Sequence, residues 1–281
     1  ALLLRDAGSP MDTRPLQDEP DLPRLIRAGR HIARPRRYIR NYAEEVEPAD
    51  LVREVSRQAA YGDGWVKLVG DWIDRDLGDL APLWPVAVLT EAVRVAHAAG
   101  SRVAVHTFAT ETIPDLLAAG VDSIEHGTGL TPALIGEVAA AGATLTATSQ
   151  VVGTFGQIAD RARPRFPAYA ARMEAMAAGY AGVLRAAFDA GVVINVGSDS
   201  GGVLPHGQIV AEIRALHAAG LPPADALAAG SWAARGWLGL PGIEEGGPAD
   251  LVVYDTDPRA DLATLAHPRR IVLRGRVLPG F

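Results

Sequence analysis

The sequence predicts an α/β protein built as a TIM-type (β/α)8 barrel. Apolar stretches of strand length alternate with helical stretches, and a glycine stands where most of the helices must end. This alternation is typical of parallel strands covered by helices. An open doubly wound sheet has the same pattern, but no glycine-rich phosphate loop follows the first strands. The lack of that loop favours the barrel.

Seven strands are predicted before residue 200. They span residues 1–5, 37–42, 65–70, 102–108, 122–126, 143–149 and 192–198. A closed barrel needs eight strands, and the shortfall is at the front of the chain. Because residues 1–6 look like a strand already under way, we expect the chain to begin inside the domain and the barrel to lack its first strand.

The predicted helices lie between and after these strands. They span residues 48–60, 86–99, 111–119, 131–141, 166–190, 207–219 and 223–235. The sequence pattern changes in the C-terminal tail, where short strands at 250–255 and 270–278 are separated by turns rich in Asp and Pro. Two strands alone are marginal in water. We therefore divide the chain into a barrel at 1–240 and the C-terminal part of a small β-sandwich domain at 241–281.

Composition narrows the function classes. The 281 residues are 48% hydrophobic, which is enough to bury one large core. The net charge of -6 gives no field that would attract nucleic acid or an anionic membrane, and no apolar run approaches the roughly 18 residues that span a bilayer. Zero Cys excludes disulfides and thiolate zinc sites. We expect a small-molecule substrate, a cytoplasmic location and room for a homo-oligomer.

Four predicted strands each carry one metal-capable or ionisable residue at or near the end: Lys67, His106, His126 and Asp199. The carboxyl ends of parallel strands converge on one mouth, so residues far apart in sequence meet there. Imidazoles and oxygen donors suit Zn²⁺ or a similar divalent ion. An ammonium has no lone pair, so Lys67 must be chemically changed or unrelated to the site. The pattern predicts a metal site at this mouth.

Each of these residues also has a plainer interpretation. The stem of Lys67 could carry its charge to solvent from a strand edge. His106 and His126 could be hydrogen-bonded core histidines, and Asp199 could cap the turn after its strand. His206, in Leu204-Pro205-His206-Gly207, either touches substrate at the same mouth or only begins the next helix.

The remaining histidines and a group of arginines are weaker candidates. His97 and His217 each stand in His-Ala-Ala-Gly at a helix end, where an imidazole favours the negative end of the dipole, so we interpret them as structural. His31 and His267 belong to no motif. Four arginines after the strand at 143–149 are expected to form a solvated face rather than a carboxylate site: Arg161, Arg163, Arg165 and Arg172.

The order of these residues, with their flanking segments, resembles the amidohydrolase superfamily, in particular its imidazolonepropionase-like and Xaa-Pro dipeptidase-like branch. The resemblance covers essentially the whole chain and is weakest over 11–47. It is carried by Arg5-Asp6-Ala7-Gly8, Ala104-Val105-His106, Ile124-Glu125-His126-Gly127, Gly197-Ser198-Asp199-Ser200, Gly246-Gly247-Pro248-Ala249-Asp250-Leu251-Val252-Val253 and Val272-Leu273-Arg274-Gly275-Arg276-Val277.

The resemblance implies a metal-dependent hydrolase of amide-type C–N bonds. Its substrates would be small peptides, including Xaa-Pro dipeptides, or N-acyl amino acids, with cyclic amides as a further option. It implies two divalent ions, most simply Zn²⁺, bridged by a carboxylated Lys67 and held also by His106, His126 and Asp199. Carboxylation requires a neutral amine, which burial favours. Asp199 would act first as general base and then as general acid.

One departure from the family pattern opens an alternative. The first strand of the family carries His-x-His, two ligands of one metal, and this sequence contains no such pair. We expect either a chain that starts downstream of that strand, with at most one tightly held ion and poor hydrolysis, or an inactive, non-catalytic barrel. A serine-protease interpretation of Asp199-Ser200-Gly201-Gly202 is disfavoured because that fold is all β and commonly contains disulfides.

Overall fold

The computed structural model describes residues 1–202 and 204–280. A seven-stranded parallel sheet with the order β11-β10-β9-β8-β5-β3-β4 forms its centre, and β1 and β2 form a separate parallel pair. These strands are β1 (Leu3–Asp6), β2 (Arg24–Arg27), β3 (His31–Ala33), β4 (Glu44–Glu45), β5 (Trp65–Val69), β8 (Arg102–Thr107), β9 (Ser123–His126), β10 (Thr144–Ala147) and β11 (Ile194–Val196). The α/β class with a parallel sheet is confirmed. Over the described ranges, hydrogen bonds do not close the strands into a barrel.

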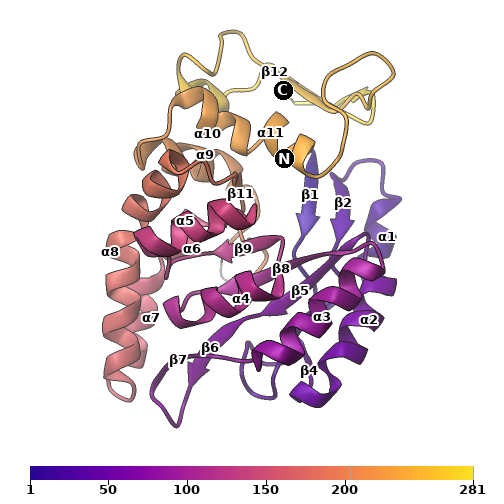
Figure 1. Cartoon of the computed structure of the whole chain (residues 1–281). Helices are drawn as coiled ribbons and strands as arrows, with labels where there is room; N and C mark the ends of the chain where they lie inside the picture. The colour runs from indigo at the N-terminus through magenta and orange to yellow at the C-terminus, as the bar shows by residue number, and fades with distance from the viewer. Residues whose placement is uncertain (203, 281) are drawn as a thin grey trace.

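Helices follow the strands and pack side by side along the sheet (Figure 1). Gly120 and Gly142 end α4 and α5 in the left-handed conformation, as the sequence predicts for glycine at a helix end. The helices are α1 (Arg14–Gln17), α2 (Leu51–Tyr61), α3 (Val86–Ala98), α4 (Ile113–Ala119), α5 (Pro132–Ala141), α6 (Ser149–Val152), α7 (Phe155–Ala162), α8 (Pro167–Asp189), α9 (Ile209–Ala218), α10 (Pro223–Ala229) and α11 (Trp232–Trp237), with short 3₁₀ turns at Pro48–Asp50, Thr110–Thr112 and Leu262–Ala266. None of the described helices combines the length and the apolar character needed to cross a bilayer.

Three element predictions are wrong. Residues 37–42 form a loop rather than a strand, because Arg36 and Asn41 adopt positive φ angles of 60° and 62° that interrupt an extended chain. The predicted helix at 223–235 divides into α10 and α11, because Ser231 leaves the helical dihedral angles. The predicted strand at 270–278 is a hairpin that turns at Arg274, where φ is 51°.

The two faces of β5 pack against different partners. Val66 and Leu68 belong to the main core between the sheet and the helices. Trp65 points to the opposite face, where it packs with Ala28 and Ala104 in a second cluster. Because side chains alternate along a strand, Lys67 shares the face of Trp65 and points away from the helices. This alternation carries Lys67 to the inner side of the sheet.

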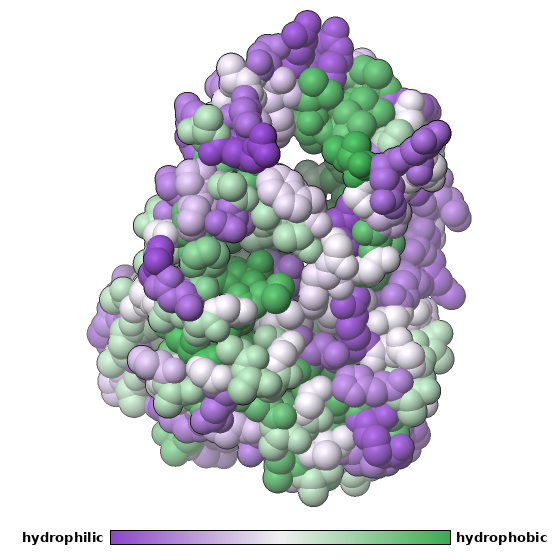
Figure 2. Space-filling model, turned by 45° about the horizontal axis from the view of Figure 1, so that its top comes forward, coloured by the Kyte–Doolittle hydropathy of each residue, from purple (hydrophilic) through white to green (hydrophobic). Residues whose placement is uncertain are grey.

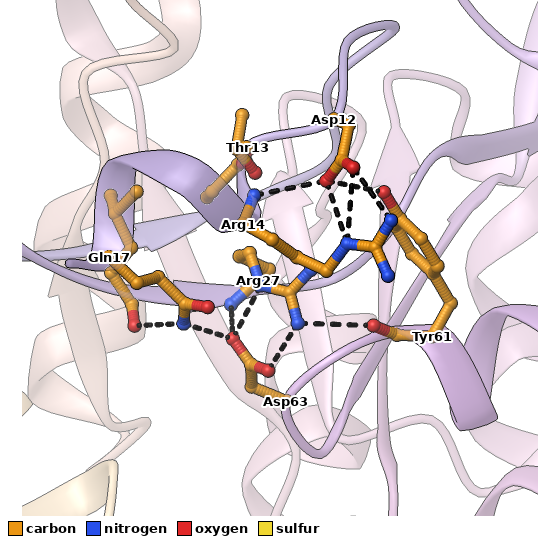
Figure 3. A network of polar contacts seen from close by, with 9 residues as sticks. Asp12, Thr13, Arg14, Gln17, Arg27, Tyr61 and Asp63 are labelled. Atoms are coloured by element: carbon orange, nitrogen blue, oxygen red, sulfur yellow. Dashed lines mark hydrogen bonds and ion pairs between the residues drawn. The ribbon is translucent and has the colours of Figure 1, made fainter.

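A polar network ties the first segments of the chain to the end of α2 (Figure 3). The carboxylate of Asp63 accepts hydrogen bonds from the guanidinium of Arg27 at 2.6 and 2.9 Å and from the amide of Gln17 at 2.8 Å. The hydroxyl of Tyr61 donates to Asp12 at 2.8 Å. These contacts fix α1 and β2 beside the loop that leads into β5.

The tail forms a three-stranded antiparallel sheet of β12 (Leu251–Val253), β13 (Arg270–Leu273) and β14 (Arg276–Val277). Asp250 anchors this sheet, since its buried carboxylate accepts the Nε–H of Arg24 at 2.5 Å and the backbone N–H of Arg274 at 2.7 Å. The surface is hollowed between the tail and the body (Figure 2), and a cavity of about 270 Å³ lies there between β1, β2 and Arg274. The domain boundary at 240/241 stays a prediction.

Replacing Asp250 with asparagine is expected to lower the free energy of unfolding by about 2 kcal/mol, because Arg24 then loses its charged acceptor. Urea unfolding followed by circular dichroism measures the loss. The control is Asp255→Asn, which removes an exposed partner of Arg269 and is expected to change little. Equal losses in the two variants would contradict the anchoring role.

Candidate metal centre

The structure brings His106 and His126 into direct contact, although they stand on different strands. On adjacent strands β8 and β9, Thr107 pairs with His126 and His106 pairs with Glu125. The Nδ1 atom of His106 lies 3.0 Å from the Nε2 atom of His126. Both side chains are buried, with 3% and 4% of their surface exposed. The parallel register therefore produces the pair of imidazoles that the sequence predicts.

Two hydrogen-bond contacts hold His126 in addition to its contact with His106. Its Nδ1 lies 2.7 Å from the hydroxyl of Thr148, and its carbonyl accepts a hydrogen bond from the hydroxyl of Tyr180 at 2.8 Å. Its φ angle of 68° is uncommon for a residue other than glycine, and such conformations concentrate at functional sites. At Gly127, which also has positive φ, a Cβ would lie 2.5 Å from the side chain of Leu145. The backbone conformation at residues 126 and 127 therefore sets the direction of the His126 imidazole.

Lys67 is buried on β5 beside a carboxylate that is already neutralised. Its Nζ lies 3.5 Å from Glu125, which also accepts hydrogen bonds from Arg5 at 2.8 and 2.9 Å and from Ser123 at 2.6 Å. Burial would raise the pKa of Glu125, but the charges of Arg5 and Lys67 outweigh it and lower that pKa. Burial lowers the pKa of Lys67 against the opposing pull of Glu125. This downward shift acts toward the neutral amine that carboxylation requires.

His31 joins this group, although no motif marks it. It stands on β3 opposite Lys67 in the register, is buried, and stacks on the ring of Tyr38 at 5.1 Å. Burial first, and then the charge of Lys67, lower its pKa well below the ordinary value. Its Nδ1 has no hydrogen-bond partner among the described residues. The signal that could have identified His31 is the short strand at 31–33. The sequence pattern predicted a strand at 37–42 instead.

Asp199 and His206 are both exposed. Asp199 follows β11 with a φ angle of 45°, and its charge acts on Tyr38, Tyr42 and His126, which places it in the same region. His206 lies beside Gly201, where an added Cβ would approach its ring to 3.1 Å. Both assignments stay predictions.

Two further histidines, His97 and His217, and two of the four arginines, Arg163 and Arg172, have structural partners. His97 Nε2 lies 2.8 Å from a carboxylate oxygen of Asp122, and His217 Nδ1 lies 2.8 Å from the carbonyl oxygen of Leu221. Arg163 pairs with Glu174, and Arg172 pairs with Asp79 and Glu111. A cavity of about 510 Å³, lined in part by Arg102 and Trp237, lies at the amino-terminal end of β8, which is the end opposite the expected mouth.

The imidazole pair suits a divalent cation. Burial, followed by the neighbouring His126 and Lys67, lowers the pKa of His106 well below its ordinary value, and burial lowers that of His126 to about 4, so both are neutral near pH 7. His106 Nε2 is buried without a hydrogen-bond partner among the described residues. The 3.0 Å between Nδ1 of His106 and Nε2 of His126 is a hydrogen-bond distance, and it is also close to the roughly 3.3 Å between two nitrogens bound to one tetrahedral zinc. Within the described ranges, no three His, Asp or Glu side chains converge into a complete cage.

A model of the amidohydrolase family matches residues 76–278. The chain belongs to the amidohydrolase family. This amidohydrolase is 50% identical over 277 residues to uncharacterized proteins of Mycobacterium tuberculosis and Mycobacterium bovis, and the match covers 98% of this chain and 75% of each relative. The predicted family is therefore confirmed.

Solved structures of the same fold include three hydrolases. One is a Xaa-Pro dipeptidase with bound methionine in the active site, with a TM-score of 0.82 and 21% identity over 99% of this chain and 75% of that chain. Another is a prolidase complexed with N-methylphosphonate-L-proline, with a TM-score of 0.79, 21% identity and the same coverage. The third is A. niger ochratoxinase, with a TM-score of 0.79 and 17% identity over 98% and 71% of the two chains. The amidohydrolase thus shares the fold of Xaa-Pro dipeptidase-type enzymes.

Proposed function

We propose that this amidohydrolase hydrolyses amide-type C–N bonds in dipeptides or N-acyl amino acids with the help of a divalent metal. The observation that carries the proposal is the buried pair of neutral imidazoles, His106 and His126, beside Lys67. Arg5 shares the charge of Glu125 with Lys67, so this carboxylate does not depend on the lysine alone. Family membership supports hydrolysis as the reaction class. The Xaa-Pro dipeptidase and the prolidase of like fold favour small peptides, including Xaa-Pro dipeptides, and cyclic amides are the next class to test.

His106 and His126 would hold one divalent ion in this chain, and a carboxylated Lys67 and Asp199 would be its further oxygen donors. When bound, the metal lowers the pKa of its water and polarises the amide carbonyl. Asp199 takes the proton of the attacking water and returns it to the leaving nitrogen. Thr148 keeps the imidazole of His126 oriented through its Nδ1 atom.

A second candidate is a non-catalytic barrel of the amidohydrolase type. The specific observations in its favour are the lack of any His-x-His pair in the sequence and the incomplete cage among the described side chains. Under this alternative the chain would bind a cation weakly and would turn over no amide substrate.

Metal loading is expected to depend on bicarbonate through Lys67. Elemental analysis of chain incubated with Zn²⁺ should give about one ion per chain, and the occupancy should fall when bicarbonate is removed, because the carbamate supplies ligand oxygens. Lys67→Met should bind less Zn²⁺ and lose the bicarbonate dependence. Removal of the metal by a chelator should lower the hydrolysis of Xaa-Pro dipeptides and N-acyl amino acids by about 100-fold or more.

Three results would contradict this proposal. One is full hydrolysis by the metal-free chain, and another is zinc binding that is the same in Lys67→Met. The third is inhibition by a serine-reactive phosphonate together with insensitivity to chelators. A chain that binds zinc but cleaves none of these amides would favour the non-catalytic barrel.

A further inference from the structure

Three half-buried aromatic side chains lie over the imidazoles of the candidate metal centre: Tyr38, Tyr42 and Trp72. We call these three side chains the aromatic cover. The ring centroid of Tyr38 lies 5.1 Å from that of His31 and 5.6 Å from that of His106. The ring of Trp72 lies 5.4 Å from His106, and that of Tyr42 lies 5.3 Å from His31. The cover therefore borders the imidazoles with ring faces and edges.

The aromatic cover is more exposed than the side chains that it borders. Tyr38, Tyr42 and Trp72 each keep part of their surface in solvent, whereas His106 and His31 are 3% and 6% exposed. A molecule that approaches the imidazoles from this side meets aromatic surface first. The hydroxyls of the two tyrosines make no hydrogen bond to the part of the chain that the structure describes, so they are available to a ligand.

The cover comes from two segments that are fastened to each other. Tyr38 and Tyr42 stand in the loop after β3, and Trp72 stands on the hairpin of β6 (Asp71–Asp74) and β7 (Asp79–Pro82). The rings of Tyr38 and Trp72 are 4.8 Å apart. The guanidinium of Arg37 joins loop and hairpin, because it donates to Asp74 at 2.8 Å and to the carbonyls of Trp72 and Ala81 at 3.1 and 3.0 Å.

The hairpin is also fastened to the strand that carries His106. Asp71 is buried, and its carboxylate accepts the backbone N–H groups of Phe108 and Ala109 at 3.0 Å each. The ring of Phe108 lies 4.3 Å from that of His106. These contacts hold the cover in a fixed relation to the imidazoles before any ligand arrives, and a preformed surface loses little freedom on binding.

The loop that carries Tyr38 and Tyr42 also carries positive charge. Arg36 and Arg40 flank Tyr38 in the sequence and are exposed, and neither has an ion-pair partner among the residues that the structure describes. Arg34 and Arg37 of the same loop are paired with Glu47 and Asp74. Free guanidinium groups favour a ligand that bears a carboxylate.

We infer that the aromatic cover makes this site selective for amides of carboxylate-bearing amino acids with an aromatic or large apolar side chain. Aromatic surface prefers offset or edge-to-face contact with another ring, which a small or charged side chain does not offer. N-acetylphenylalanine fits this class, whereas N-acetylalanine lacks the ring. The inference rests on the proposed function for cleavage of the amide bond. The preference for an aromatic side chain in the ligand does not rest on it.

Two measurements test the selectivity on the zinc-loaded chain. The first compares kcat/KM for N-acetylphenylalanine and N-acetylalanine, and we expect a ratio of about 10 or more in favour of the aromatic substrate. Tyr42→Ala and Trp72→Ala should each reduce this ratio several-fold. Tyr254→Ala, which removes a half-buried tyrosine of the C-terminal tail, is the matched control and should leave the ratio unchanged.

The second measurement does not depend on turnover. Calorimetric titration compares the binding of 3-phenylpropionate and propionate, and we expect the aromatic acid to bind about tenfold more tightly, with the difference reduced in Tyr42→Ala. Cleavage of both amides at equal kcat/KM would overturn the inference and leave the proposed function standing. Preferential binding of 3-phenylpropionate without cleavage of any amide would support the inference and overturn the proposed function. Equal binding of the two acids would overturn the inference.

Discussion

Replacing His126 with asparagine is expected to weaken zinc binding by more than about 100-fold and to reduce amide hydrolysis to the background rate. The imidazole of His126 is neutral, buried and 3.0 Å from that of His106. Even residues that only orient a metal ligand cost 10 to about 100-fold in affinity when they are removed, so the loss of a ligand itself should cost more. Asparagine retains a polar group that can reach Thr148, which limits the disturbance of the fold.

Competition with a fluorescent zinc chelator measures the affinity, and the release of free amine measures hydrolysis. His217→Asn is the matched control, because its imidazole contacts the carbonyl of Leu221 and lies at the end of α9. Both variants should unfold cooperatively if the substitution is tolerated. Zinc affinity that is equally reduced in both variants, or reduced in neither, would remove His126 from the metal centre.

Acid is expected to destabilise the metal-free chain through His126. Burial lowers the pKa of His126 to about 4, from an ordinary value of 6.5, so the unfolded chain binds a proton at pH values where the folded chain does not. The stability that depends on the neutral imidazole is complete above about pH 6.5 and is lost as the pH falls toward 4. The full loss from this one group is about 3 kcal/mol.

Two carboxyl groups act with the opposite sign, so the measurement has to be a difference between variants. Burial raises the pKa of Asp71 and of Glu212 to about 7 each, and the folded chain therefore gains stability from their protonation as the pH falls from 7 toward 4. Urea unfolding of the parent and of His126→Asn, both with a chelator present, cancels these contributions.

Between pH 7.5 and pH 4.5 the His126→Asn variant should gain about 2.5 kcal/mol in free energy of unfolding relative to the parent. If the difference between His126→Asn and the parent stays constant over this range, His126 does not carry the acid sensitivity.

The sequence predicts the parts of this protein that repeat a simple pattern. Strands such as 102–107 and 123–126 are apolar runs preceded by a helix and a glycine, so periodicity and helix-end chemistry agree on them. The placement of Lys67, His106 and His126 on three neighbouring strands follows from that regularity. The metal site follows from the residue types at the strand ends, the carbamate and the role of Asp199 follow from the resemblance alone, and all three stay predictions.

The segment between residues 11 and 47 could not be predicted in the same way. Its strands are only two to four residues long, and Arg36 and Asn41 adopt positive φ angles that interrupt the extended chain between them. His31 was missed because its place in the site follows from the strand register that sets it opposite Lys67. Tyr38 and Tyr42 were missed as part of the site because their loop meets the hairpin of Trp72 only through tertiary contacts, such as those of Arg37.

The bridge from Arg5 to Glu125 joins the first strand of the chain to the middle of the sheet across 120 positions of sequence. The strand that bears Arg5 pairs with β2 and not with the seven-stranded sheet. Its attachment to that sheet therefore depends on side chains such as the guanidinium of Arg5, which also stacks on Trp65 at 4.5 Å. If that strand detached, Glu125 would be left with Lys67 as its counter-charge. Docking of the first strand therefore decides whether Lys67 shares the charge of Glu125 with Arg5 or carries that counter-charge alone.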